Sequence, residues 1–460
     1  FRVGGDGHGG SPRGVRGVTG GAEGVNRGGQ EGDADGAPAH RSDRGSPSIT
    51  SVHRSHAGNS FETADGLGHS GAEGKAPAMT RRERTIILAR GAATLLVAMG
   101  LGRFAFTALL PAMQAGGGFS DADAGLMASL NLAGYLAGVF LAGRASPPLR
   151  LVLFRLGLVV AILCIAGMAL SLGLWVWDLL RLAAGISSGF LFVLATAYVF
   201  ERGATTGPTG AALHFAGVGT GIALTGLTAQ FIPDWRVAWS FLGLVALALA
   251  VPAWGVPGTT VRSAAAPATA PRMRWTPAFV VLVIAYALEG LGYIVTGTFL
   301  VAILRRLPET APLASFAWVL AGLAAIPSPL VWMRVAHRFG AWGSLTAAYV
   351  VQAIGIFLPL TGSPVAALVS AASYGFTFIG ITGVSIALAA RLQPGATARA
   401  TALITIGYGI GQVIGPWAAG LAATGSSGFA LPLIGAGTVV TLSAILSAVG
   451  HVVAKRETGG

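Results

Sequence analysis

The sequence predicts an all-α polytopic membrane protein whose helices form two six-helix repeats, and three observations support this fold class. Hydrophobic residues make up 53% of the 460-residue chain and charged residues only 10%, with a mean hydropathy of +0.68. Long apolar runs recur along the chain, and glycine patterns repeat at a constant spacing. A chain of this composition has more apolar surface than a soluble globule can hide, so we expect it in a lipid bilayer.

About twelve apolar runs reach the length of roughly 20 residues that a helix needs to cross the hydrocarbon core. Helices are expected because lipid offers no partners to backbone N–H and C=O groups, and the alternating pattern of a spanning β-barrel is not seen in the sequence. The expected spans are 86–114, 122–145, 149–172, 175–200, 210–231, 236–256, 277–304, 312–333, 340–361, 364–391, 397–424 and 429–453.

The segments outside the spans predict the remaining organisation of the chain. Residues 1–78 are rich in Gly, Asp, Arg, Ser and His without an apolar pattern, which is typical of a disordered extension. An alternative is that this extension is not native, because Met79 opens the basic lead MTRRERT directly before the first apolar run. The expected order after the extension is an N-terminal half over 79–254, a cytoplasmic linker over 255–276, a C-terminal half over 277–454 and a cytoplasmic tail over 455–460.

Loop arginines predict the orientation. Most arginines outside the spans fall on one side, whereas the opposite side has Arg236, Arg305 and Arg306. The positive-inside rule places the arginine-rich side and both termini in the cytoplasm. We therefore expect a multi-pass protein of the bacterial inner membrane, working as a monomer. The net charge of +12 then reflects loops that face an anionic leaflet, so the lipid bilayer is an expected partner and nucleic acid is not.

A repeat with an offset of 190 residues divides the spans into two halves. Glycine patterns and a loop arginine recur at this offset: GLG at 100–102 and 290–292, GxGxG at 217–221 and 407–411, Gly185 and Gly375, and Arg144 and Arg334. Each match is weak in a glycine-rich chain, but a common offset in four places indicates an internal duplication.

Two parallel six-helix repeats joined by a cytoplasmic linker resemble the major facilitator superfamily, whose substrate sites lie at the midplane between the halves. RLAAGISSG, starting at Arg181, resembles the arginine-and-glycine signature of the superfamily's fourth helix, and GQVIGP, starting at Gly411, resembles the glycine-proline signature of its eleventh helix. The helix-packing and gating positions that the resemblance implies are Gly185, Gly189, Gly411, Gly415 and Pro416. The loop GRASPPLR departs from the superfamily pattern because it lacks an acidic residue.

A narrower resemblance rests on GLGRFAFTALLPAMQ, SLNLAGYLAG, ALEGLGYIVTGTFLVAIL and GYGIGQVIGPWAAG. These stretches resemble the YbfB/YjiJ-type branch of the superfamily, and the resemblance covers residues 79–455. It implies a secondary transporter and indicates no substrate.

Arg103 and Glu289 are the leading candidates for substrate binding and proton coupling. A charged side chain near the bilayer centre costs several kcal/mol unless it faces protein, water or a partner. Glu289 corresponds to Met99 in the repeat, four residues before Arg103, so the two charged residues differ in depth by roughly 6 Å. If they face each other, Glu289 can carry a proton, because desolvation favours the neutral carboxyl and a guanidinium favours the charged one. The alternatives are a structural ion pair, or separate hydrogen bonds to backbone carbonyls.

Further polar residues predict a cavity wall, because several lie one helical turn apart and share a helix face. The candidates are Asn131, Tyr135, Arg181, Tyr293, Tyr408 and Gln412. Aromatic rings and amides suit an amphipathic organic substrate, although amides also join membrane helices. Arg181 can instead pair with Asp178, three residues earlier, or extend toward the membrane surface. His214 is expected to be a hydrogen-bonded surface residue.

The expected function is secondary active transport of a small organic solute by alternating access, with the proton gradient as the energy source and without a cofactor or metal. The single cysteine, Cys164, lies inside an apolar run and offers no cysteine metal site. Import and export both remain open. A polytopic membrane enzyme and a receptor or channel are the alternatives. An enzyme is disfavoured because the sequence has no paired carboxylates or HExxH motif near a membrane face.

Overall fold

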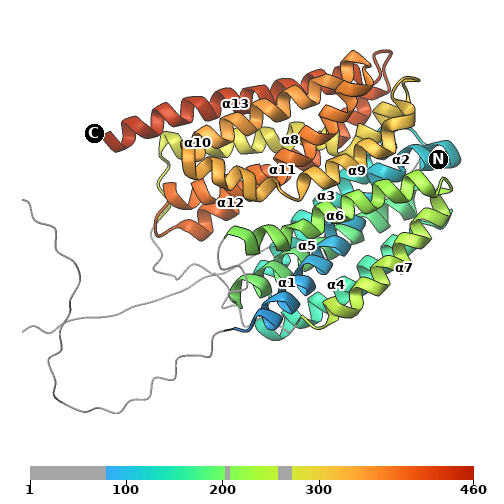
Figure 1. Cartoon of the computed structure of the whole chain (residues 1–460), viewed down its shortest axis with the longest axis horizontal. Coiled ribbons are helices and arrows are strands. Elements are labelled where there is room, and N and C mark those ends of the chain that lie inside the picture. Colours follow the sequence, from blue (N-terminus) through green and yellow to red (C-terminus); the bar gives the residue numbers. More distant parts are fainter. Residues whose placement is uncertain (1–78, 203–207, 257–271, 460) are drawn as a thin grey trace, which may run out of the picture. The chain divides into compact units, whose positions relative to one another are not determined.

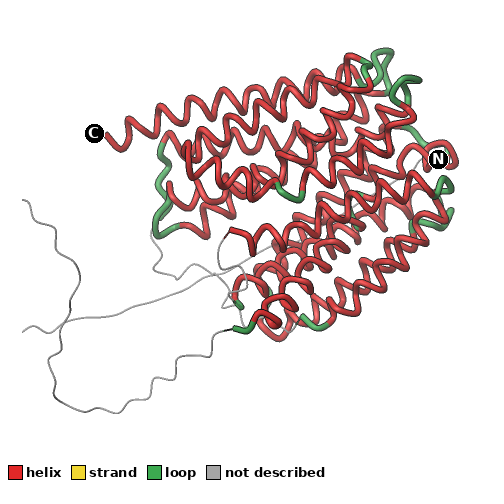
Figure 2. The backbone as a smooth tube through the Cα atoms, in the orientation of Figure 1, coloured by secondary structure: helices red, strands yellow, loops and turns green. Residues whose placement is uncertain are grey.

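The structure is a computed structural model, and it describes residues 79–202, 208–256 and 272–459. The predictions for the extension 1–78 and for most of the linker 255–276 lie outside the described residues. All regular elements of the described residues are helices (Figure 2), which confirms the predicted fold class. These residues belong to one compact unit.

The N-terminal half contains one π-helix among its α-helices. Its elements are α1 Arg81–Leu95, η1 Leu96–Leu101, α2 Ala105–Gly117, α3 Asp121–Arg144, α4 Pro147–Gly167, α5 Leu174–Glu201, α6 Pro208–Phe231 and α7 Trp235–Trp254. Polar caps mark where the chain enters the bundle, since Thr80 and Ser120 each form a capping box with an acidic residue three positions later.

The C-terminal half contains two short 3₁₀ helices in addition to its α-helices. Its elements are α8 Pro277–Arg305, η2 Ala311–Leu313, α9 Ala314–Ala325, α10 Ser328–Phe357, η3 Leu358–Thr361, α11 Pro364–Leu392, α12 Thr397–Ala423 and α13 Ala430–Gly459. Proline occupies the first turn of α8 and α11, where its missing N–H removes no helical hydrogen bond.

Eleven helical stretches of the described chain are long and apolar enough to cross a membrane. One of them, Ser328–Thr361, contains a turn at Gly340, whose φ of 81° favours glycine. The eighth predicted span therefore consists of α9 and the start of α10, separated by a turn at residues 326–327, and α10 continues through the expected loop 334–339 as far as Gly340. Separating α9 with the first part of α10 from the part after Gly340 gives twelve crossings, eleven plus one.

Two features of the helices could not be seen in the predicted spans. The first span is not a continuous helix, because η1 and residues 102–104 interrupt it between α1 and α2. Phe104 donates its N–H to the Met99 carbonyl, five residues earlier, which is π-helical spacing. At the other end of the chain, α13 extends to Gly459, so the described part of the predicted tail 455–460 is helical.

The halves pack their helices in equivalent ways. A Cβ atom on Gly185 would overlap the Asn131 carbonyl oxygen, and one on Gly375 would overlap that of Ala321, which is Asn131 shifted by 190 residues. Close approach of helix backbones is thus needed at the same place in both repeats.

The helices alternate in direction, so the start of α1 and the end of α13 lie at one end of the bundle, here called the terminal end; the opposite end is called the distal end (Figure 1). Helices α8 and α10 to α13 gather on one side, and α1 and α4 to α7 on the other. Contacts of α3 with α12, α6 with α9, and α2 with α8 join the two halves. Their facing surfaces enclose the candidate site.

Candidate functional site

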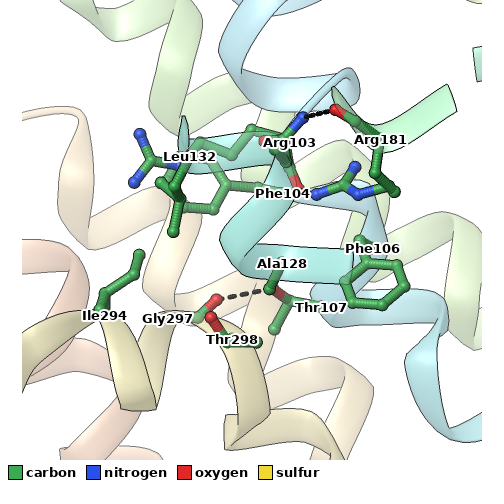
Figure 3. A pocket seen from close by; sticks show the side chains of 11 residues that line it. Arg103, Phe104, Phe106, Thr107, Ala128, Leu132, Arg181, Ile294, Gly297 and Thr298 are labelled. Carbon is green, nitrogen blue, oxygen red and sulfur yellow. Dashed lines mark hydrogen bonds between the residues drawn. The ribbon is translucent and has the colours of Figure 1, made fainter. Parts of the chain in front are cut away.

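Arg103 lies at the break between η1 and α2 and is only 6% exposed. The break leaves backbone carbonyls without regular helical geometry, and Arg181 of α5 supplies donors to two of them. Its Nη1 donates to the Gly102 oxygen at 2.9 Å and its Nη2 to the Arg103 oxygen at 3.4 Å. Figure 3 shows both arginines beside the start of α2.

These hydrogen bonds decide against the two alternatives considered for Arg181. The side chain is 3% exposed and its described hydrogen bonds go to the first span, so it neither pairs with Asp178 nor extends to the membrane surface. Two charged residues spaced three apart on a helix can form an ion pair, but Arg181 points into the bundle. Its N–H donors bind the backbone carbonyls that the interruption of the first span leaves available.

The Arg103 guanidinium faces the opposite half of the molecule. Its Nη2 donates to the Tyr293 hydroxyl of α8 at 3.4 Å, and its Cζ lies 5.2 Å from the Phe104 ring centre and 5.7 Å from that of Tyr135. Within the described residues, Arg103 forms no ion pair and no hydrogen bond with Glu289. The direct contact considered for the two charged residues is therefore not formed.

Glu289 is fully buried in α8, one helical turn before Tyr293. Neither of its carboxylate oxygens forms a hydrogen bond with a described residue. The Gln352 side chain of α10 is a polar neighbour of the carboxyl, and it donates its own Nε2–H to Thr377 at 3.1 Å. Buried polar groups without partners are uncommon and call for an explanation.

Tyr293 connects the predicted cavity residues. Its hydroxyl accepts from Arg103 and also from the Nε2 of Gln412, which lies on α12. Its ring stacks against Tyr408 with centres 5.7 Å apart, and Tyr408 stacks in turn on Tyr286 at 4.3 Å. The structure thus brings Arg103, Tyr293, Tyr408 and Gln412 together.

Asn131 does not contact Tyr293 as Gln412, the other candidate amide, does. It is fully buried in α3, and its Nδ2 donates to the Arg181 carbonyl at 2.9 Å. This bond joins α3 to α5 where Gly185 packs against the Asn131 backbone. The geometry matches the helix-joining use of membrane amides that the sequence left as an alternative.

A central cavity of about 80 Å³ lies between the halves. Seven of its thirteen lining residues are aromatic, and Arg103 is the charged residue among them. The aromatic lining residues are Phe104, Tyr135, Phe192, Phe215, Tyr293, Phe378 and Tyr408. Glu289 is outside this lining. The phenylalanines were missed in the sequence because an aromatic residue in an apolar span carries no polar signal.

Two further hollows lie along the interface of the halves. One, of about 10 Å³, is lined by Arg103, Arg181 and Thr107, and it is crossed by a 2.6 Å hydrogen bond from the Thr107 hydroxyl to the Gly297 carbonyl (Figure 3). The other, of about 340 Å³, lies at the distal end beside the 2.6 Å ion pair of Arg306 with Asp121. These two interactions hold the halves together on the distal side of the central cavity.

The predicted packing glycines all lie against neighbouring backbone. Cβ atoms on Gly189, Gly411 and Gly415 would meet the carbonyl oxygens of residues 135, 287 and 291, and the Pro416 carbonyl lies against Gly125 of α3. These positions place α5 on α3, α12 on α8, and α12 on α3. They fix helix approach in this conformation, while their gating role stays a prediction.

His214 differs from its prediction because it is fully buried in α6. Its Nε2 lies 3.1 Å from the Thr196 hydroxyl of α5, and its ring lies against Gly91 of α1. The side chain therefore sits within the N-terminal half and outside the lining of the central cavity.

The fold of this chain is similar to that of several membrane transporters of known structure. No curated protein sequence matches the chain significantly. Among solved structures, the nucleoside transporter NupG is 14% identical with a TM-score of 0.61, covering 80% of this chain and 99% of that one. The D-xylose-proton symporter is 15% identical with a TM-score of 0.61, covering 80% and 97%. A bacterial homolog to the human lysosomal transporter Spinster, inward-facing and unoccupied, is 14% identical with a TM-score of 0.55, covering 82% and 97%.

These structural likenesses are too low in identity to show more than the fold. The sequence model of one family, MFS_4, described as "Uncharacterised MFS-type transporter YbfB", matches residues 95–448. The match spans well over half of the chain and includes the residues that line the central cavity and the interruption of the first span. The chain therefore belongs to the MFS_4 family of YbfB-type membrane transporters.

Proposed function

We propose that this transporter is a proton-coupled carrier of a small organic solute, working by alternating access with Arg103 in the substrate site and Glu289 as the proton carrier. It acts as a monomer in the bacterial inner membrane, with the terminal end in the cytoplasm. Arginines of the connections between helices, including Arg144 at the end of α3 and Arg202 after α5, lie at that end.

The observation that carries the proposal is the fully buried carboxyl of Glu289, which forms no ion pair with a described residue and lies one turn from the residue that contacts Arg103. An unpaired carboxylate is far more costly to bury than a neutral carboxylic acid. The conformation described here therefore suits a protonated Glu289. A conformation that admits water to α8 would allow the proton to leave, so proton release and the opening of the site become linked.

Tyr293 supports a connection between proton and substrate. It lies on the same face of α8 as Glu289 and accepts the hydrogen bond from Arg103. A substrate that binds Arg103 competes with this hydrogen bond and displaces the Tyr293 hydroxyl or Gln412. Such a change next to Glu289 provides the differential interaction that coupling requires.

The test uses purified protein in liposomes with an imposed pH gradient of either sign. A mixture of small organic solutes is added outside, and mass spectrometry identifies those that accumulate in the lumen. The expected result is pH-gradient-dependent accumulation of at least one solute by the unmodified protein. Glu289→Gln is expected to lose at least tenfold of the gradient-driven accumulation, since its amide cannot carry the proton. Arg103→Gln should lose accumulation because it removes the binding charge.

Exposed residues provide the matched controls. Glu309→Gln and Arg144→Gln make the same chemical changes at exposed positions away from the central cavity, so both should transport like the unmodified protein. Gradient-driven accumulation that persists in Glu289→Gln would refute the assignment of the proton carrier. An ion flux that does not saturate as the ion concentration rises would instead indicate a channel.

A further inference from the structure

The central cavity contains a positive charge whose counter-charge is not supplied by the described residues. Arg103 is 6% exposed, and within the described chain its polar interaction is one long hydrogen bond to Tyr293. None of the thirteen residues that line the cavity is Asp or Glu. Buried charges in proteins are normally paired, so the site favours an anion that comes from outside the chain.

A second guanidinium strengthens this preference. Arg181 is also buried, and it bonds the carbonyls of residues 102 and 103, immediately beside the Arg103 side chain. Its donors are directed at backbone rather than into the central cavity, which leaves Arg103 as the group that contacts the anion. One guanidinium suits one carboxylate-sized charge, because its parallel N–H groups match two oxygens of a planar anion.

The remaining cavity wall is aromatic and partly arranged in parallel. Tyr293 and Tyr408 stack at 11° between their planes, and Tyr293 and Phe378 at 12° with ring centres 6.1 Å apart. Tyr135 faces them from α3 in the other half, with its ring near Arg103. Aligned rings offer faces and edges on which another aromatic ring gains stacking energy beyond simple apolar burial.

The size of the cavity limits the occupant. Its volume of about 80 Å³ is smaller than the cavity of roughly 150 Å³ that holds benzene in a protein interior. Side chains that line the cavity must therefore move outward before any ring can enter. A single ring with one charged group needs less of this movement than fused rings or a disaccharide.

We propose that the transported solute is a single-ring aromatic monoanion, whose carboxylate or equivalent charge binds Arg103 while its ring packs against Tyr293, Tyr408, Phe378 and Tyr135. This inference rests on the proposed transport function and gives it a substrate class. The charged residue supplies the selection for anions, and the aromatic wall supplies the selection for the ring.

The first experiment measures equilibrium binding of radiolabelled benzoate to the purified full chain in detergent. Competitors change one property at a time: cyclohexanecarboxylate keeps the charge without the aromatic ring, benzamide keeps the ring without the charge, benzylammonium reverses the charge, and acetate lacks the ring. Benzoate is expected to compete at least tenfold better than each of them. Equal competition by cyclohexanecarboxylate or by benzamide would overturn the inference, because the ring or the charge would then not be recognised.

Variants locate the binding site. Arg103→Gln is expected to weaken benzoate binding at least tenfold, which corresponds to about 1.4 kcal/mol. Arg103→Lys should restore part of the affinity, because a point charge replaces the planar guanidinium. Arg144→Gln removes an exposed arginine and should bind benzoate normally. Unchanged binding in Arg103→Gln that remains folded by size-exclusion chromatography would place the anion elsewhere and contradict the proposal.

A transport arm separates this inference from the function on which it rests. Benzenesulfonate is a single-ring monoanion that does not cross lipid as a neutral acid, so its accumulation in liposomes reports the protein. If a different solute accumulates with the pH gradient while benzoate does not bind and benzenesulfonate does not accumulate, the substrate class is wrong and the transport function stands. If benzoate binds at Arg103 but no solute accumulates, the transport function is wrong and the anion site stands.

Discussion

At the scale of single residues, the Tyr293 hydroxyl connects the polar side chains of the site. It accepts hydrogen bonds from Arg103 of one half and Gln412 of the other, and all three residues line the central cavity. Tyr374 offers a comparison in the same group of stacked rings. Its hydroxyl is buried and forms no hydrogen bond with a described residue, although its ring lies parallel to Tyr293 within 13°.

The two tyrosines should therefore respond differently to loss of the hydroxyl. Tyr293→Phe leaves buried donors of Arg103 and Gln412 unpaired, which is expected to lower the free energy of unfolding by about 1–3 kcal/mol. Tyr374→Phe removes an already unpaired polar group and should be neutral or stabilising. Thermal unfolding of both purified variants checks this expectation. An equal loss of stability in the two variants would show that the van der Waals contacts of the hydroxyl, which both tyrosines lose, rather than the Tyr293 hydrogen bonds set the effect.

The sequence singled out Arg103 and Glu289, both of which are buried in the structure, because a charge within an apolar run is conspicuous. It did not predict the partner of Arg103, since a residue's depth in the membrane leaves its rotation about the helix axis undetermined. Glu289 and Arg103 have nearby depths, yet Tyr293 takes the contact. The error for His214 has a related origin, because its burial depends on the small residue Gly91 in a helix far along the chain.

At the scale of secondary structure, small residues determine how closely the helices approach. The helices themselves were predictable, since roughly 20 apolar residues in a row have few other solutions in lipid. The interruption of the first span was not, because GLGRF reads as apolar and helical until the π-helical hydrogen bonds and the donors of Arg181 are known. Glycine matches at the 190-residue offset, by contrast, did identify real packing positions such as Gly185 and Gly375.

Adding one methyl group at such a position should destabilise the bundle. In Gly375→Ala the new Cβ would overlap the Ala321 carbonyl oxygen, and backbone cannot move aside as a flexible side chain can. The expected cost is about 1–3 kcal/mol, partly offset by the better helix propensity of alanine, about 1 kcal/mol. The net loss should appear as a lower thermal unfolding temperature, with the same direction for Gly185→Ala.

Gly435→Ala is the control for helix propensity, because a Cβ at this α13 position meets nothing within 4 Å. It should leave the unfolding temperature unchanged or slightly higher. If Gly375→Ala behaves like Gly435→Ala, the close helix approach at α9 and α11 does not constrain stability, and the equivalence of the two repeats at this point loses its physical basis.

At the scale of the whole molecule, contacts between the halves follow the internal repeat. Arg103 contacts Tyr293 and Thr107 contacts Gly297, and both pairs are separated by 190 residues. Equivalent residues that touch each other mark the axis that relates the repeats, so this axis passes between the first and seventh spans. The distal ion pair of Asp121 with Arg306 must separate if the site is to open at that end.

The charges near this axis predict how transport responds to membrane voltage. With a deprotonated Glu289, the empty site carries one negative and one positive charge, on Glu289 and Arg103. With Glu289 protonated and a monoanion on Arg103, the positive and negative charges again balance. Under the proposed assignments the protein around the site carries the same net charge in both forms, and one proton accompanies each monoanion without net charge transfer.

Accumulation of benzenesulfonate driven by a fixed pH gradient should consequently be insensitive to membrane potential. Valinomycin and potassium gradients can impose about 100 mV of either sign across the liposomes. One uncompensated charge would change the accumulation ratio on the order of 40-fold, since 100 mV acts on it with about 2.3 kcal/mol. We expect less than a twofold change. A ratio that follows the potential would rule out the one-to-one balance between Glu289 and the anion, because net charge would then cross the membrane with each solute.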